Sequence, residues 1–259
     1  MGGWARTRKI VPDNSLIGAP IMTSASAPMT SSASVTTTSA FWERLWRTAG
    51  IQFVGFFIVT SVIYGYQPGV GASADALTAF YGGDRTRILI AATLSGLNVL
   101  NLMWFAAALR TTLATAGQDG WGAAATTASA LFGGLTLLSL TISAALAYSI
   151  AGSGNNTLTS ALNDFSWALA VLTAFPRAML IMSGAFGLWR AGQISNGLFT
   201  VGVTFVVLGV LGGTTWISGG LWAPDGVYTR FVSPLLLLVW AVGVSRVLLS
   251  RSPATRGSW

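Results

Sequence analysis

Residues 88–109 read ILIAATLSGLNVLNLMWFAAAL, a stretch of 22 residues without a charge that lies between Arg87 and Arg110. A transmembrane α-helix needs about 20 mainly apolar residues to cross about 30 Å of hydrocarbon. The stretch has this length, and it contains no charged side chain that would have to be buried in lipid. It therefore predicts a membrane-spanning helix.

The composition of the whole chain supports the same assignment. Of 259 residues, 53% are hydrophobic and only 8% are charged, and the mean hydropathy is +0.65. Soluble domains carry about 25% charged residues, so an ordinary soluble domain and a disordered regulator are excluded. A nucleic-acid-binding protein would need Lys and Arg clustered on a soluble face, and we expect no nucleic-acid partner. The expected partner is the lipid bilayer.

Five further apolar runs have similar lengths, and together they predict an all-α integral membrane bundle of six transmembrane helices. The predicted spans are 48–66, 87–109, 122–149, 166–189, 196–217 and 231–249. We divide the chain into a disordered Ser/Thr-rich cytoplasmic tail (1–40), the six-helix transmembrane domain (41–250) and a short cytoplasmic tail (251–259). Met22 and Met29 offer alternative starts.

The distribution of Lys and Arg predicts the orientation of the bundle, because cytoplasmic loops carry an excess of these residues. With the N-terminus inside, the cytoplasmic side holds ten of them and the outer side three. The ten are Arg6, Arg8, Lys9, Arg44, Arg47, Arg110, Arg190, Arg246, Arg251 and Arg256, and the three are Arg85, Arg87 and Arg230. We therefore expect both termini to be cytoplasmic, in a multi-pass protein of the plasma membrane.

His and Cys are both absent from the sequence. Their absence excludes metal sites built on thiolate or imidazole, and also Ser-His-Asp and Cys-His nucleophilic catalysis. The acidic residues all lie near the ends of the apolar runs, which argues against an intramembrane carboxylate relay. We expect no metal and no cofactor. An enzyme is not expected either, because Asp164 and Arg177 are about 20 Å apart along a helix, too far for joint acid–base work.

Arg177 is the one charged residue near the middle of a predicted span, since Arg87 and Arg246 lie at or near the ends of theirs. It lies thirteen residues after Asp164 and thirteen before Arg190, which places it about 20 Å from each and close to the bilayer centre. A central Arg costs from about 2.5 to more than 10 kcal/mol, so it should face the bundle interior or a water-filled cavity. Pro176 precedes it, and a proline there kinks the helix and frees the carbonyl of Leu172.

Other polar side chains lie at the same predicted depth, and with Arg177 they form the candidate ligand-binding site: Asn98, Asn101, Thr136 and Thr173. No acidic residue shares this depth. Two interpretations follow. Arg177 is either a hydrogen-bonded strut that ties the fourth span to the second, or its counter-charge comes from an anionic ligand, a lipid headgroup or an acidic residue of a partner subunit.

Four short motifs resemble a known family. They are ALTAFYGGDRTRI at 76–88, MWFAAALR at 103–110, LNDF at 162–165 and FPRA at 175–178. Together they resemble a family of six-span bacterial integral membrane proteins of unknown function, found often in high-GC genomes, over about residues 45–250. The resemblance implies a six-helix fold and a plasma-membrane location, and it supplies no activity.

The sequence thus favours a membrane protein that binds or transports a small anionic or amphiphilic ligand at a mid-membrane polar site around Arg177. The alternative is an accessory or structural subunit of a larger membrane complex. Stripes of small residues such as Gly202, Gly209 and Gly213 suit close helix packing in either case.

Overall fold

The computed structural model describes residues 48–250, and within this range the chain is all-helical with no strand. The tails predicted at 1–40 and 251–259 lie outside the described residues. The α-helices are α2 (Ala49–Tyr64), α3 (Ala74–Thr78), α4 (Arg85–Thr115), α5 (Asp119–Ala145), α6 (Asn156–Leu172), α7 (Ala174–Arg190), α8 (Asn196–Gly212) and α9 (Ser233–Ser250). Short π or 3-10 turns extend them: η1 (Ala79–Gly83), η2 (Leu146–Ile150), η3 (Ala151–Ser153) and η4 (Tyr228–Val232).

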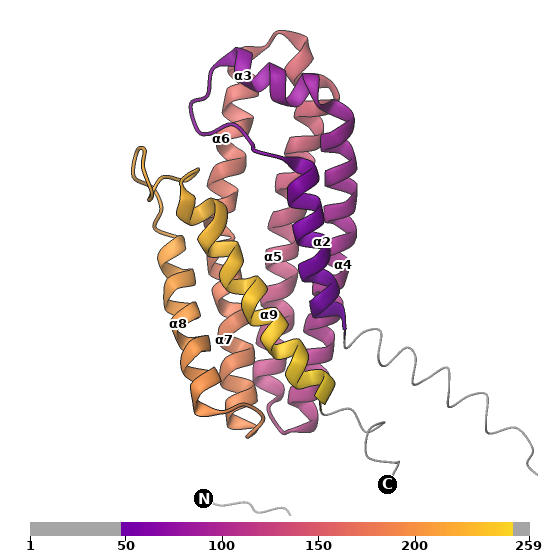
Figure 1. Ribbon diagram of the computed structural model, residues 1–259, viewed down its shortest axis with the longest axis vertical. Coiled ribbons are helices and arrows are strands. Elements are labelled where there is room, and N and C mark those ends of the chain that lie inside the picture. The colour runs from indigo at the N-terminus through magenta and orange to yellow at the C-terminus, as the bar shows by residue number, and fades with distance from the viewer. Residues whose placement is uncertain (1–47, 251–259) are drawn as a thin grey trace, which may run out of the picture.

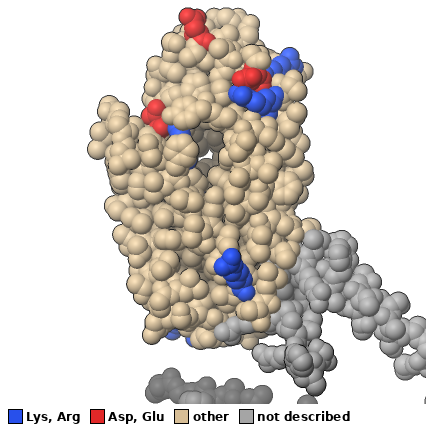
Figure 2. Space-filling view, viewed as in Figure 1, with Lys and Arg blue, Asp and Glu red and all other residues tan. Residues whose placement is uncertain are grey.

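The long helices run side by side along the longest axis of the molecule (Figure 1). The short helix α3 lies across one end, called the α3 end, together with the connections from α5 to α6 and from α8 to α9. The other end, called the opposite end, holds the start of α2, the end of α9 and the turns from α4 to α5 and from α7 to α8. Charged side chains gather toward the two ends of the face in Figure 2, and most of its middle is uncharged.

Four helical segments are long and apolar enough to cross a membrane: Arg85–Thr115, Asp119–Ser153, Asn156–Arg190 and Tyr228–Ser250. The apolar helices α2 and α8 have 16 and 17 residues, about 24 and 26 Å at 1.5 Å per residue. Large apolar side chains such as Val62, Leu131 and Val207 are exposed on the outside of the bundle. An apolar exterior of this kind is typical of a protein whose solvent is lipid.

The third helical segment differs in length from its prediction. The span predicted at 166–189 is the second part of a helical segment that begins ten residues earlier, at Asn156. The side chain of Asn155 caps this start by accepting a hydrogen bond from the amide of Leu158 at 3.1 Å. Residues 156–165, predicted as an outer loop, are therefore helical, and the segment extends past the length of a single bilayer crossing.

The helical path breaks at Thr173, between α6 and α7 and three residues before Pro176. A proline at 176 has no N–H to donate to the carbonyl of Leu172, and its ring crowds that turn. The amides of Thr173 and Arg177 still bond to the carbonyls of Leu169 and Thr173, at 2.9 and 3.2 Å. The break thus interrupts the helix locally without separating α6 from α7.

A polar network ties the loop formed by residues 65–72 to α6. The amide of Gln67 donates to Ser166 Oγ at 2.8 Å, and the buried Asn163 accepts from the hydroxyl of Tyr81 at 3.0 Å and donates to the carbonyl of Gly69 at 3.0 Å. The indole of Trp167 donates to the carbonyl of Pro68 at 2.9 Å. Burial raises the pKa of Tyr81, which therefore stays a neutral donor. The 65–72 loop is held firmly over the α3 end of the bundle.

Candidate functional site

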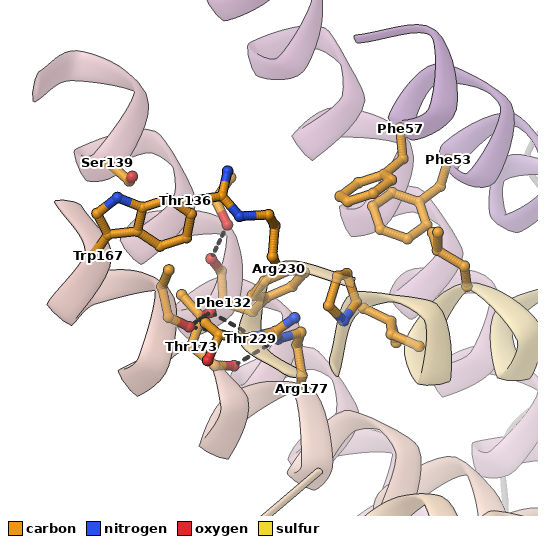
Figure 3. A pocket seen from close by; sticks show the side chains of 14 residues that line it. Phe53, Phe57, Phe132, Thr136, Ser139, Trp167, Thr173, Arg177, Thr229 and Arg230 are labelled. Carbon is orange, nitrogen blue, oxygen red and sulfur yellow. Dashed lines mark hydrogen bonds between the residues drawn. The ribbon is translucent and has the colours of Figure 1, made fainter. Parts of the chain in front are cut away.

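A cavity of about 250 Å³ opens inside the bundle between α2, α5, the α6–α7 segment and the η4–α9 segment. Figure 3 shows it from close by. Its lining residues are Phe53, Phe57, Phe132, Thr136, Ser139, Trp167, Ala170, Thr173, Arg177, Thr229, Arg230, Pro234, Leu237 and Leu238. Each helix contributes residues three to four positions apart, the spacing that places side chains on one helix face. The cavity is thus built by one face of each of four helical segments.

Arg177 reaches this cavity from α7 and is buried. Its Nε donates to the carbonyl of Thr173 at 3.2 Å, and its Nη2 donates to the carbonyl of Ala170 at 3.3 Å and to Thr173 Oγ1 at 3.0 Å. Helical side chains point back toward the N-terminus of their helix. The guanidinium therefore lies one to two turns nearer the α3 end than the backbone of Arg177.

These contacts correct the acceptor expected from the sequence. The side-chain carbonyls of the asparagines and the freed carbonyl of Leu172 were the expected acceptors for some of the guanidinium donors, and the structure instead gives Arg177 the carbonyls of Ala170 and Thr173. The reason is rotation about the helix axis: the side chain of Leu172 is 44% exposed on the outside of the bundle, whereas Ala170 and Thr173 line the cavity. Arg177 also stacks on Phe132, with its guanidinium carbon 5.7 Å from the ring centroid.

Only part of the Arg177 guanidinium is satisfied by the protein. A guanidinium has five N–H donors, and the three hydrogen bonds above engage Nε and Nη2. Within residues 48–250, Nη1 has no protein acceptor. Two donors of a positively charged group therefore remain for a cavity occupant.

A second arginine, Arg230, lines the same cavity from η4. Its guanidinium carbon lies 3.9 Å from the ring centroid of Tyr66 and 4.4 Å from that of Trp167. Nε donates to the backbone carbonyl of Asp225 at 3.2 Å and Nη1 to that of Gln67 at 2.9 Å. Its side chain is half-buried, and its Nη2 has no acceptor among the described residues.

The cavity carries two positive groups and no negative one. No Asp or Glu belongs to its lining, and within 48–250 neither arginine forms an ion pair; the pair between Arg87 and Asp84 lies at the α3 end. Hydroxyls of Thr136, Ser139, Thr173 and Thr229 add polar groups to the wall. Such a site favours an occupant with negative charge and several hydrogen-bond acceptors.

The structure brings together part of the predicted site. Arg177, Thr173 and Thr136 line the cavity, and Pro176 lies one residue before Arg177 beside the helix break. Asn98 and Asn101 are not among the lining residues. Asn98 is buried in α4, and its side-chain oxygen has no hydrogen-bond partner. Counting residues grouped these asparagines with Arg177 by predicted depth, but it could not give the rotation of α4 that leaves them out of the lining.

Sequence reasoning missed Arg230 as a site residue and treated it as an outer-loop charge. The aromatic part of its environment comes from Tyr66 and Trp167, which lie 164 and 63 positions earlier in the chain. A sequence signal does exist in hindsight: Arg230, Pro234, Leu237 and Leu238 have the spacing of one helix face. That pattern shows a shared face, and it does not show what the face contacts.

No group of three or more His, Cys, Asp or Glu that could hold a metal ion occurs in the part of the chain that the structure describes. Comparison with known proteins found no matching family model, no matching curated protein and no matching solved structure. The resemblance to a six-span bacterial family therefore stays an expectation from the motifs.

Proposed function

We propose that this protein is an integral membrane protein that binds a small anionic or amphiphilic ligand in the cavity between Arg177 and Arg230. The observation that carries the proposal is the pair of guanidinium groups in one cavity without a lining carboxylate. Burying an unpaired charge costs several kcal/mol. An anion in the cavity would offset that cost for the buried Arg177 and accept from the donors on Nη1 of Arg177 and Nη2 of Arg230 that have no protein acceptor.

The contacts of Arg177 favour this role over that of a strut between the fourth and second predicted spans. All three of its side-chain hydrogen bonds go to Ala170 and Thr173, which belong to its own helical segment or its break. Its one aromatic contact is with Phe132 of α5. Among the described residues no hydrogen bond joins Arg177 to α4. The side chain therefore does not connect the fourth predicted span to the second, as a strut would.

We also propose that α2, α4, α5, the α6–α7 segment, α8 and the η4–α9 segment each cross the plasma membrane, with both termini cytoplasmic. The ends of these six segments alternate between the opposite end and the α3 end (Figure 1), as six successive crossings require. The positive-inside count supports the same orientation. α2 and α8 are short enough that the bilayer would thin slightly around them.

The absence of cysteine makes this topology directly testable. Single cysteines replace Thr115 at the opposite end and Thr157 at the α3 end, both of which are exposed. In intact cells a membrane-impermeant maleimide should label Thr157→Cys and leave Thr115→Cys unlabelled until the cells are lysed. Labelling of the Thr115→Cys variant in intact cells would reverse the proposed orientation.

Ligand binding is tested by thermal unfolding of the purified protein in neutral detergent, with a panel of phosphate, sulfate, carboxylate and alkyl-phosphate additives. A binding anion should raise the unfolding temperature by mass action. Arg177→Gln should remove the rise, and Arg246→Gln, which changes an exposed arginine outside the cavity, should keep it. Equal shifts in the wild type and Arg177→Gln would place the binding elsewhere and refute the proposal.

The accessory-subunit role stays a prediction, as does the absence of enzymatic activity. Purification from native membranes in mild detergent separates the first from ligand binding, because a subunit should bring stoichiometric partners and a ligand-binding protein should retain small molecules.

A further inference from the structure

The cavity has a polar side and an apolar side. The hydroxyls of Thr136, Ser139 and Thr173 and the carbonyls that hold Arg177 come from α5 and the α6–α7 segment. In contrast, α2 and α9 contribute only apolar side chains: Phe53, Phe57, Pro234, Leu237 and Leu238. Figure 3 shows Phe53 and Phe57 together on one flank, with the two arginines between them and Trp167 and Thr173. A free inorganic anion has no apolar part that could pack against the side chains of the apolar flank.

The apolar flank lies where α2 and α9 diverge. Near the opposite end these helices touch closely, since a Cβ added at Gly50 of α2 would collide with Ser245 Oγ of α9. Toward the α3 end they separate (Figure 1), and Phe57 of α2 and Pro234 of α9 both line the cavity. Figure 2 shows a deep hollow in the upper half of this face of the molecule. The cavity therefore opens sideways, at a level that the proposed topology places within the bilayer.

The size of the cavity fits a part of a ligand. Pockets that enclose a whole small-molecule ligand measure about 300–1,000 Å³, and this cavity measures about 250 Å³. A headgroup fits inside, and a longer chain has to leave through the opening between α2 and α9.

From these observations we infer that the ligand is an amphiphile: an oxyanion headgroup, phosphate or carboxylate, held between Arg177 and Arg230, with an alkyl chain passing between Phe57 and Pro234 into the bilayer. This inference rests on the proposed function, because it specifies which anion the same two arginines take. Nη1 of Arg177 and Nη2 of Arg230 donate to the headgroup oxygens. Phe53, Phe57 and Leu238 contact the first carbons of the chain.

The inference is tested by photo-crosslinking in nanodiscs of phosphatidylcholine. The probe is a long-chain alkyl phosphate that carries a diazirine on the carbons nearest its headgroup. Crosslinked peptides should map to residues 53–57 of α2 and 234–238 of α9, and excess dodecyl phosphate should displace the probe. Arg177→Gln should reduce this labelling at least tenfold, and Arg246→Gln should leave it unchanged. Labelling that is spread over the outer apolar surface and insensitive to Arg177→Gln would overturn the inference.

A matched pair of neighbouring substitutions tests the chain path separately. Phe57→Trp fills the flank of the cavity, whereas Phe56→Trp adds the same bulk at an exposed position outside the lining. The thermal shift by dodecyl phosphate should fall at least severalfold in Phe57→Trp and persist in Phe56→Trp, while the shift by methyl phosphate stays the same in both. If Phe57→Trp does not fold, the crosslink map of the wild type alone decides.

The results also separate the two proposals. One result would be that inorganic and methyl phosphate stabilise the wild type as much as dodecyl phosphate does, and that Arg177→Gln abolishes this stabilisation. That result would refute the amphiphilic ligand and support anion binding. If no anion, with or without a chain, gives a shift that depends on Arg177, both proposals fall.

Discussion

Nη1 of Arg230 donates a hydrogen bond of 2.9 Å to the backbone carbonyl of Gln67, a residue 163 positions earlier in the chain. This bond joins the start of the last helical segment to the 65–72 loop, which the network around Asn163 fastens to α6. One side chain thus closes the α3 end of the bundle and also lines the cavity. The two roles give separate predictions.

The first prediction concerns the loop. Arg230→Gln removes the stacking on Tyr66 and Trp167 and the bond to Gln67, and we expect a loss of about 1–3 kcal/mol of stability. Hydrogen exchange of residues 65–72, measured by mass spectrometry without added ligand, should become faster. Arg85→Gln is the control, because Arg85 stacks on Tyr148 with 4.6 Å to the ring centroid and lies outside the cavity lining. Unchanged exchange in Arg230→Gln would show that the loop holds without this arginine.

The second prediction concerns the stability cost of Arg177. A buried charge without an ionic partner carries a desolvation penalty of several kcal/mol, and an apolar residue of similar volume avoids that penalty. We therefore expect Arg177→Met to unfold without ligand at the same temperature as the wild type or a higher one, while it loses the stabilisation by anions. Thermal unfolding in detergent measures both. A fall in stability of more than about 2 kcal/mol in Arg177→Met would instead identify Arg177 as a structural strut.

The third prediction concerns Asn163, which is fully buried. Asn163→Leu leaves the hydroxyl of Tyr81 and the carbonyl of Gly69 without their partner, and each buried unsatisfied group costs about 1–3 kcal/mol. The expected loss is about 2–5 kcal/mol, measured by denaturant unfolding in micelles. Asn156→Leu, at an exposed position of the same helix, should change stability by less than about 0.5 kcal/mol. Equal effects of the two substitutions would contradict the role given to the network.

The fourth prediction concerns helix packing. A Cβ at Gly184 of α7 would collide with the indole ring of Trp240, which itself packs edge-on against Phe105 with 6.1 Å between the ring centroids. Gly184→Ala should cost about 1–3 kcal/mol through overpacking. A Cβ at Gly134 of α5 meets nothing within 4 Å, so Gly134→Ala should stabilise the helix by up to about 1 kcal/mol. Denaturant unfolding in micelles measures both substitutions. If Gly184→Ala stabilised the protein, the result would contradict the packing between α7 and α9.

Much of the fold was predictable because the length and the apolar character of each uncharged run can be read directly from the sequence. The apolar stretch at 88–109 lies inside α4, and the runs predicted at 196–217 and 231–249 overlap α8 and α9. The main difference, the early start of α6 at Asn156, depends on the cap of Asn155, a single-residue signal within a polar stretch that resembles a loop.

The candidate site was predictable only in part, and the reason is geometric. Residue counting fixes the position of a side chain along a helix, and three residues grouped on that basis, Arg177, Thr173 and Thr136, line one cavity. Rotation about the axis is different, because in a membrane bundle the lipid-facing and core-facing sides are both apolar and the usual amphipathic signal is weak. Asn98 and Asn101 were grouped with Arg177 by depth, and the rotation of α4 leaves them out of the lining.

The sequence by itself determined an all-helical chain with segments long enough to cross a bilayer, a positive charge inside one of them and no acidic residue at its depth, because these follow from composition and spacing along the chain. Only the tertiary structure decided that Arg230 joins Arg177 in the lining of one cavity, that each has a terminal nitrogen without an acceptor among the described residues, and that α2 and α9 contribute apolar side chains to the same cavity. Those facts depend on how helices far apart in sequence rotate and cross, and that is set by close packing at positions such as Gly50 and Gly184, where a side chain larger than hydrogen would hold the helices apart.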